Sequence, residues 1–495
     1  MHPPRPLGRL VLLLLILAWA IPSARAQSQA QALLPDALLA DAGIVEAAYP
    51  GLVELASRPG GRVVAGVGSE ALQTLLDQLA AGAFTRETDA ALRLVIQGLS
   101  RQTGALGALG RNVTQDVAGA ASASGSSEAM RGVSRLLFAV MDDLANPYSI
   151  LAQALLSEKL LCGAAAAGDD ELAREIAERT SPDRGAGFLT RTDGTTADRY
   201  GLHDRADLYS VVAQGDRVVA AGYFGTVAVS QDAGASFRTP ATGTDEPLYA
   251  AAFGPGDEVW AVGRRGTVLH SGDGGESFAP YPTPFDRPLF GVSAGTAGEA
   301  LVVGDFGLQL MRDAATERWH CVPRDEDIIL GRIVPAGPDR ALVAEFGTIE
   351  RLPGGRLPGR RGELTGVPED VYLFDLWFDD SGQVGIAVGL SGTVMRSEDG
   401  GATWAPVVAG LDADLYGVGG AGNRVVVAGE RGMVAVSDDR GRSFTQQTVP
   451  GLRLPFHDVA MSDPESGYLV GPRGLIVALR EGGKRFEILR GPGAP

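Results

Sequence analysis

Four copies of one motif place an aspartate between hydroxyl residues, with a spacing close to that of calcium-binding loops. The motif reads Ser-x-Asp-x-Gly-x-Ser/Thr-Phe/Trp, and its copies are Ser230–Phe237, Ser271–Phe278, Ser397–Trp404 and Ser437–Phe444. Calcium is usually held by several carboxylates at once, whereas each copy supplies one or two. An aspartate in such a turn also accepts backbone N–H bonds, and the glycine permits a left-handed residue. We therefore interpret Asp232, Asp273, Asp399 and Asp439 as structural turn residues and expect no metal site.

The residue types that most hydrolases and metalloenzymes use do not form a recognisable motif in this chain. The histidines His203, His270, His320 and His457 are far apart, without the His-x-x-x-His or Cys-x-x-Cys spacing of metal ligands. No Gly-x-Ser-x-Gly motif accompanies a plausible catalytic triad, and none of the glycines belongs to a phosphate-binding loop. We therefore expect no catalytic residues and no cofactor.

The chain has two cysteines, Cys162 and Cys321. An oxidising compartment would permit them to form a disulfide, but they belong to different predicted domains. We favour two separate buried thiols, and the sequence leaves the pairing open.

A pattern of about forty residues recurs seven times from residue 208 to the end of the chain. Each copy has a leucine–aromatic pair or its equivalent, a β-rich stretch, Gly-x-x-Gly and another β-rich stretch; in the fourth copy Ala344 replaces the first glycine. The second glycines are Gly225, Gly266, Gly307, Gly347, Gly392, Gly432 and Gly474. A fixed period of this size is typical of a β-propeller, with one small sheet for each repeat. The sequence thus predicts an all-β, seven-bladed propeller over residues 206–490.

The expected strand order places the Gly-x-x-Gly turns and the Ser-x-Asp motifs on opposite faces of the propeller. The residue before each second glycine should then form a ring on the Gly-x-x-Gly face: Phe224, Arg265, Phe306, Phe346, Ser391, Arg431 and Arg473, with Arg264 beside Arg265. Aromatic residues and arginine dominate protein-binding hot spots, so we predict that this ring binds a protein partner. The alternative is that each phenylalanine caps its own hairpin and each arginine is solvated. We interpret the aromatic pairs at the strand starts as packing residues between blades.

The part of the chain before the propeller is predicted to be helical and to follow a signal peptide. Residues 1–26 have early arginines, a short apolar run and Ala24-Arg25-Ala26, which is typical of a cleaved export signal. Residues 27–180 are the predicted helical region and residues 181–205 a linker. Apolar spacing predicts helices over Leu33–Ala48, Ser69–Ala81, Thr85–Ser100, Val133–Cys162 and Asp170–Arg179. Gly104–Ser127 is rich in small residues and is interpreted as a flexible connection, and Gly187–Arg191 as a short strand.

The net charge argues against nucleic acid as a partner, and the hydropathy pattern argues against a membrane-spanning protein. The formal net charge is −17, and a nucleic-acid binder needs a basic surface. The apolar run of the export signal is shorter than the roughly 20 residues that span a bilayer. We therefore expect an exported protein, periplasmic or secreted, that does not span a membrane after cleavage near Ala26 and Gln27.

The combination of Gly-x-x-Gly-Thr-Val with the Ser-x-Asp motif resembles the photosystem II stability/assembly factor family. The best matching copies are Gly263–Val268 with Ser271–Phe278 and Gly389–Val394 with Ser397–Trp404, and the motif itself resembles the Asp-box of sialidase-like and sortilin-like propellers. The resemblance covers a little over half the chain. It implies a non-catalytic, lumenal or periplasmic propeller that binds newly made reaction-centre protein during assembly. The helical region departs from the family's plain members, so the partner could belong to another envelope complex.

The alternative function is that of a sialidase-like propeller that binds or hydrolyses glycans. Such an enzyme needs three arginines for a substrate carboxylate, a tyrosine nucleophile with its glutamate, and an acid/base. Here Tyr209, Tyr249 and Tyr416 occupy repeat positions, so none is singular. We therefore favour the protein-binding function and predict that the chain is not an enzyme. The sequence does not identify the partner, the oligomeric state or the role of residues 27–180.

Overall fold

The structure, a computed structural model, describes residues 41–53, 67–100, 104–141, 159–180 and 203–492, the last range with gaps at 282, 284, 296–297, 316–318, 322–327, 356–358 and 367–370. The chain divides into two compact units, Met1–Arg184 and Gly185–Pro495. The predicted signal peptide, the predicted strand Gly187–Arg191 and most of the predicted linker lie outside the described residues. These features stay predictions.

The first unit is helical, as predicted. Its helices are α3 (Ala42–Ala48), α5 (Val67–Ala80), α6 (Arg86–Ser100), α7 (Gly104–Ala123), α8 (Ser127–Met141) and α10 (Asp170–Thr180), and residues 159–166 are also helical. Helix α6 packs against α3, α7 and α8, with Leu92, Val95 and Ile96 among its buried residues. The predicted start of the last helix is confirmed: Asp169 accepts a hydrogen bond from the Leu172 N–H at 3.1 Å and pairs with Arg131.

One prediction for this unit is wrong. The stretch Gly104–Ser127, interpreted as flexible, contains the twenty-residue helix α7. Its alanines favour a helix, and Val113, Val117 and Ala121 are fully buried because small neighbours let other helices approach closely. Within the predicted helix Val133–Cys162, the described residues are helical: α8 covers Ser127–Met141 and residues 159–162 are also helical, whereas residues 142–158 lie outside the described residues.

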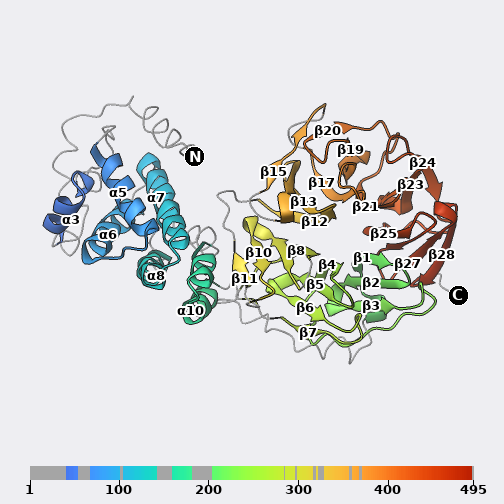
Figure 1. The fold of residues 1–495 in the computed structure, drawn as a ribbon, viewed down its shortest axis with the longest axis horizontal. Helices are drawn as coiled ribbons and strands as arrows, with labels where there is room; N and C mark the ends of the chain where they lie inside the picture. Colours follow the sequence, from blue (N-terminus) through green and yellow to red (C-terminus); the bar gives the residue numbers. More distant parts are fainter. Residues whose placement is uncertain are drawn as a thin grey trace. The chain divides into compact units, whose positions relative to one another are not determined.

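The second unit is a seven-bladed β-propeller, as predicted, and each blade is built from consecutive strands (Figure 1). Blades 1 to 4 contain β1 (Leu208–Gln214), β2 (Arg217–Gly222) and β3 (Val227–Ser230); β4 (Leu248–Phe253), β5 (Val259–Gly263), β6 (Val268–Ser271) and β7 (Ala279–Pro280); β8 (Leu289–Ala294), β9 (Ala300–Gly304), β10 (Gln309–Arg312) and β11 (Trp319–Cys321); and β12 (Leu330–Ala336), β13 (Asp339–Ala344), β14 (Thr348–Leu352) and β15 (Arg360–Arg361).

Blades 5 to 7 contain β17 (Leu373–Phe378), β18 (Gly385–Gly389), β19 (Val394–Ser397) and β20 (Thr403–Pro406); β21 (Leu415–Ala421), β22 (Arg424–Gly429), β23 (Met433–Ser437) and β24 (Thr445–Thr448); and β25 (Asp458–Asp463), β26 (Ser466–Val470), β27 (Ile476–Arg480) and β28 (Arg485–Arg490). Strand β16 (Glu363–Leu364) pairs in parallel with β20, and blade 1 has a single bridge, Val229 to Arg238, in place of a fourth strand.

In five blades the first strand begins at the leucine of the predicted pair: Leu208, Leu248, Leu289, Leu373 and Leu415. It begins later than predicted in the two blades where the predicted pairs are Ile329-Leu330 and Pro455-Phe456. Strand β12 begins at Leu330, because the N–H of Ile329 donates to the Glu345 side chain. Strand β25 begins at Asp458, because the N–H of Phe456 bonds the Gly429 carbonyl of the preceding blade.

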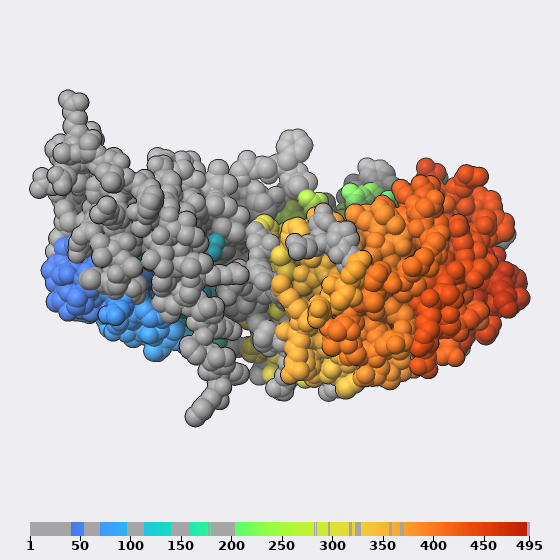
Figure 2. Space-filling view, turned by 90° about the horizontal axis from the view of Figure 1, so that it is seen from above, coloured from blue at the N-terminus to red at the C-terminus, as the bar shows by residue number. Residues whose placement is uncertain are grey.

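The core of the propeller lies between neighbouring blades. One cluster joins blades 6 and 7 through Val426, Val434 and Leu469, and another joins blades 4 and 5 through Val343, Leu376 and Trp404. The space-filling view shows blades 4 to 7 as adjoining surfaces in chain order, from yellow through orange to red (Figure 2). Apolar contact between sheet faces is therefore what holds each blade to the next.

The propeller closes between blades 7 and 1 without strand exchange among the described residues. The Leu208 N–H donates to Gly471 O at 3.0 Å, and the Gly474 N–H donates to Ala206 O at 2.8 Å. Leu208, Val211 and Tyr468 are buried together at this junction. The strand pairing expected from Gly187–Arg191 falls outside the described residues.

Cys162 and Cys321, the two cysteines of the chain, are both disulfide-bonded. The expectation of two separate thiols is therefore wrong, since neither cysteine is free. In the described ranges, none of the helices has the length and apolar character to cross a bilayer.

Candidate functional site

The two recurring turns of each blade lie at opposite ends of its strands. In blade 1, the Ala233 N–H of the Ser-x-Asp turn donates to Asp216 O at 2.9 Å, beside the β1–β2 hairpin. The Tyr223 N–H of the Gly-x-x-Gly turn donates to Asp207 O at 2.8 Å, beside the start of β1. We name these two faces the Ser-x-Asp end and the Gly-x-x-Gly end.

Every Gly-x-x-Gly turn holds two consecutive residues in the left-handed conformation. The second glycines have φ between +63° and +75°. At Gly225 a Cβ atom would also come within 1.9 Å of Thr244 O, so both conformation and space require glycine. Two positive φ values in succession match a type I′ turn, which suits the twist of a hairpin.

The residue before each second glycine is not glycine or asparagine, although the turn favours them. These seven residues have φ between +53° and +60°: Phe224, Arg265, Phe306, Phe346, Ser391, Arg431 and Arg473. A left-handed conformation costs a residue with a Cβ atom about 1–2 kcal/mol. Strained residues of this kind concentrate at functional sites, so the repeated large side chains at the turn tips favour a role in binding.

The seven tip residues differ in how far they reach into solvent. Phe346 is 56% exposed, and Ser391, Arg431 and Arg473 are also exposed, as is Arg264 beside the ring. Phe224 and Phe306 are half-buried, because the Phe224 ring packs edge-on against Tyr223 at 4.4 Å and the Phe306 ring lies under Arg287 at 4.5 Å.

Two of the predicted arginines are engaged within the chain. Arg265 lies 3.3 Å from a carboxylate oxygen of Asp286 and 3.9 Å from one of Glu246, and its side chain is mostly covered. Arg431 lies 3.9 Å from Asp412 and 3.7 Å from Glu430. The ring is therefore not a continuous set of available cations, and Phe346 is its one exposed phenylalanine.

A second set of ring-bearing residues surrounds the axis at the Gly-x-x-Gly end, and the five aromatic ones belong to the pairs interpreted from the sequence as packing between blades. These residues follow the first buried residue of each inner strand segment: Tyr209, Tyr249, Phe290, Phe374, Tyr416 and His457. Neighbouring rings are 5.4 to 6.0 Å apart, as for Tyr249 with Phe290 and Tyr209 with Tyr249. They do pack blade against blade, and Phe374 is also 38% exposed. We name this set the aromatic collar; in blade 4 its position is held by Gly331.

The inner strands enclose a central cavity of about 380 Å³, lined by residues of all seven blades. At its Gly-x-x-Gly end Arg332 of blade 4 lies between two buried carboxylates. Its Nε is 3.2 Å from Asp375 Oδ1, and its Nη2 is 2.9 Å from Asp458 Oδ2. The same guanidinium reaches Ser210 Oγ at 3.4 Å, so one side chain connects blades 4, 5, 7 and 1.

The carboxylates of this cluster also accept backbone hydrogen bonds from the next blade. Asp458 accepts from the Val211 N–H at 2.9 Å, and Asp375 accepts from the Val418 N–H at 2.8 Å. Burial raises the pKa of Asp375 to about 7, although Arg332 pulls in the opposite direction. The pKa of Arg332 is raised by the same two carboxylates, against the effect of its own burial. This cluster could not be predicted from the sequence, because its residues occupy a repeat position that is small or neutral in the other blades.

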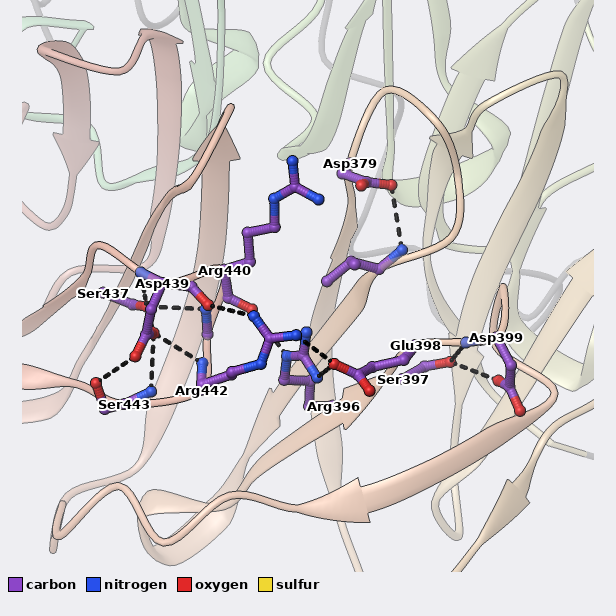
Figure 3. Close-up of polar contacts among 12 residues, drawn as sticks. Asp379, Arg396, Ser397, Glu398, Asp399, Ser437, Asp439, Arg440, Arg442 and Ser443 are labelled. Atoms are coloured by element: carbon purple, nitrogen blue, oxygen red, sulfur yellow. Dashed lines mark hydrogen bonds and ion pairs between the residues drawn. The ribbon is translucent and has the colours of Figure 1, made fainter.

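The Ser-x-Asp turns are filled by their own donors, as Figure 3 shows for blade 6. Asp439 accepts from the Ser437 hydroxyl at 2.7 Å, the Ser443 N–H at 2.9 Å and the Ser443 hydroxyl at 2.6 Å. These bonds outweigh burial and lower the pKa of Asp439 to about 2. The described residues contain no group of acidic, histidine or cysteine side chains placed to hold a metal ion. The aspartate carboxylates thus stabilise their own turns by accepting hydrogen bonds. In the blade 5 copy, Trp404 at the end of the motif is fully buried.

The same turns also join neighbouring blades, which the sequence did not reveal. The carbonyl of the fourth turn residue accepts a hydrogen bond from a side chain of the preceding blade in all four copies. The pairs are Arg480 to Ala233 O (3.0 Å), Gln231 to Gly274 O (2.8 Å), Arg351 to Gly400 O (2.8 Å) and Arg396 to Arg440 O (2.8 Å). In Figure 3 Arg396 reaches the blade 6 turn, and Glu398 pairs with both Arg396 and Arg442. The Ser-x-Asp end is therefore occupied by contacts that hold the propeller together.

Comparisons with known proteins found similarity in solved structures alone. No family model matches the chain, and no curated protein matches it. The structure of YCF48 bound to D1 peptide is 18% identical, with a TM-score of 0.47, over 56% of this chain and 94% of that one. YCF48 from Cyanidioschyzon merolae is 16% identical, with a TM-score of 0.47, over 56% of this chain and 96% of that one.

Proposed function

We propose that this protein is an exported, non-catalytic propeller that binds a protein partner through its Gly-x-x-Gly end and assists the assembly or stability of a membrane complex. One observation supports the Gly-x-x-Gly end as the binding face. Among the described residues six large hydrophobic side chains are exposed, and five of them lie at this end: Tyr223, Ile329, Phe346, Tyr372 and Phe374. Clustered exposed apolar residues mark interaction surfaces.

The Ser-x-Asp end is a poorer candidate. Its aspartates are satisfied by their own turns, and its arginines donate to carbonyls of the next blade, as with Arg396 and Arg440 O. A partner at that end would have to displace these bonds. The part of the function that concerns export and a membrane complex rests on the predicted signal peptide and on the sequence resemblance.

The glycosidase alternative gains no support from the centre of the propeller. Arg332 is the one arginine among the residues that line the described central cavity, and both Asp375 and Asp458 pair with it. A substrate carboxylate would have to compete with two carboxylates already in place. This arrangement differs from the three arginines that such an enzyme needs.

A site-specific cross-link tests the proposal. Phe346 is replaced by a photoreactive phenylalanine analogue in the full chain, expressed in its native host, and adducts are identified by mass spectrometry. We expect an adduct with a discrete membrane-complex subunit. The matched control places the analogue at Glu276, which is exposed at the Ser-x-Asp end. Adducts of equal yield at both positions, or none at Phe346, would refute the proposed face.

A further inference from the structure

The exposed apolar residues are not spread evenly around the Gly-x-x-Gly end. Four of them belong to blades 4 and 5 or to the segments that lead into those blades, and together we name them the apolar arc: Ile329 (37% exposed), Phe346 (56%), Tyr372 (40%) and Phe374 (38%). An arc of this kind, in which several large apolar side chains stand together, is the part of the face where contact with a partner removes most apolar surface from water.

The residues of the apolar arc are neighbours in space. The ring centroids of Phe346 and Tyr372 are 6.3 Å apart. Ile329 accepts a backbone bond from Glu345, the residue before Phe346, at 3.0 Å. Phe374 continues the arc toward blade 6, where its ring is 5.6 Å from Tyr416. The four side chains therefore form one surface and not four separate ones.

The aromatic collar is interrupted beside this arc. Six blades place an aromatic ring or His457 at the collar position, and blade 4 has Gly331. A Cβ atom at Gly331 would meet a single neighbour within 4 Å, Val343 O at 3.7 Å. The backbone there is not left-handed, so the conformation does not demand glycine. The missing side chain leaves room for a group from outside, next to Arg332 and its carboxylates.

The charges around the apolar arc are acidic. Glu345 precedes Phe346, and Asp412 and Asp414 lie in the segment that leads into blade 6; the Asp412 side chain is 92% exposed. Arg431 of blade 6 is already paired with Asp412 and Glu430. Beneath Gly331 one arginine faces two aspartates. A partner complementary to this surface must carry positive charge.

We infer that the apolar arc binds a short segment of the partner that carries both apolar and basic side chains. An apolar side chain enters the gap at Gly331 and packs against Phe346 and Phe374, and basic side chains face Glu345 and Asp412. This inference rests on the proposed function and specifies the chemistry of the segment that is bound. It differs from the predicted ring of phenylalanine and arginine residues, because Arg265 and Arg431 are paired within the chain.

Three labelled peptides test the inference by fluorescence anisotropy with the full chain. The first alternates lysine with leucine and phenylalanine, the second has glutamate for every lysine, and the third has serine for every leucine and phenylalanine. We expect the first peptide to bind at least about 10-fold more tightly than either of the others, since both charge and apolar burial contribute. Added salt should weaken its binding, because the Asp412 carboxylate is exposed to solvent.

Two variants localise the binding. Gly331→Tyr fills the gap without removing any existing side chain and should weaken the first peptide about 10-fold or more. Its matched control is Gly272→Tyr at the Ser-x-Asp end, where a new side chain also has open space around it and should change nothing. Glu345→Gln keeps the oxygen that accepts the Ile329 N–H and should weaken binding several-fold through its lost charge.

The outcomes separate the two proposals. Equal binding of the lysine and glutamate peptides, or equal behaviour of Gly331→Tyr and Gly272→Tyr, overturns the inference. If no peptide binds while the photoreactive group at Phe346 still captures a membrane-complex subunit, the chemistry assigned to the segment is wrong and the proposed face stands. If no peptide binds and no adduct forms, both proposals fail.

Discussion

Replacing Arg332 by methionine should destabilise the propeller strongly, although the new side chain is of similar length and apolar. Arg332 is held between Asp375 and Asp458, which are each only about 2% exposed. Without the guanidinium, two buried carboxylates would face each other unpaired. Removing one partner of a buried ion pair costs about 3–5 kcal/mol. For a unit of this size that loss lowers the unfolding temperature by about 10 °C.

Intrinsic tryptophan fluorescence is the assay. Of the five tryptophans, Trp19 is in the predicted signal peptide and the other four, Trp260, Trp319, Trp377 and Trp404, lie in the propeller. Unfolding followed by their emission therefore reports on the propeller in the full chain. The matched control is Arg485→Met, which removes an exposed pair with Glu481 and should cost less than about 1 kcal/mol.

The pH dependence of the stability lost in Arg332→Met gives a second readout. Burial raises the pKa of Asp375 to about 7, so the folded state holds this proton more tightly than the unfolded state. Its contribution to stability is fully present below about pH 4 and is lost as the pH rises through 7. The deficit of Arg332→Met should thus be larger at pH 8 than at pH 5. A deficit below about 1 kcal/mol, equal to that of the control, would refute the assignment of Arg332 as the link across the axis.

Three further predictions concern the Ser-x-Asp end. Arg480→Met removes the bond to Ala233 O that joins blades 7 and 1 and should cost about 2 kcal/mol in chemical denaturation; a cost no greater than that of Arg485→Met would contradict the inter-blade role. Hydrogen bonds lower the pKa of Asp232 to about 2, and the other three turn aspartates are lowered too, so stability present above pH 4 should fall between pH 4 and 2; a flat acid profile would count against these bonds. A chelator should leave the unfolding temperature unchanged, and a drop reversed by calcium would overturn the structural interpretation of the turns.

The repeat in the sequence was sufficient to predict the propeller because each blade depends on local turn chemistry. Glycine at positions such as Gly225 is required both by the backbone angle and by the close approach of Thr244 O. Because each blade needs this glycine at the same place, it recurs in the sequence once per blade. The strand order then placed the turns at opposite ends. Helix α7 escaped prediction because its alanines and glycines fit both a flexible segment and a close-packed helix.

The site could be predicted in position but not in detail. The sequence identified Phe346 and the other tip residues, because the turn spacing fixes where they lie. It could not show that Arg265 is held by Asp286 and Glu246, since those residues are distant along the chain. Arg332, Asp375 and Asp458 lie in different blades and meet only when the ring closes. Such contacts depend on tertiary packing and leave no local pattern.

Hydrogen–deuterium exchange of the full chain with the subunit captured at Phe346 distinguishes binding at the Gly-x-x-Gly end from binding at the Ser-x-Asp end. We expect slower exchange in the turn that contains Glu345, Phe346 and Gly347 and in the segment before β17, where Tyr372 lies. We expect unchanged exchange in the Ser-x-Asp turn from Ser437 to Ser443. Protection of that turn with no change at Glu345–Gly347 would show that the partner binds the other face.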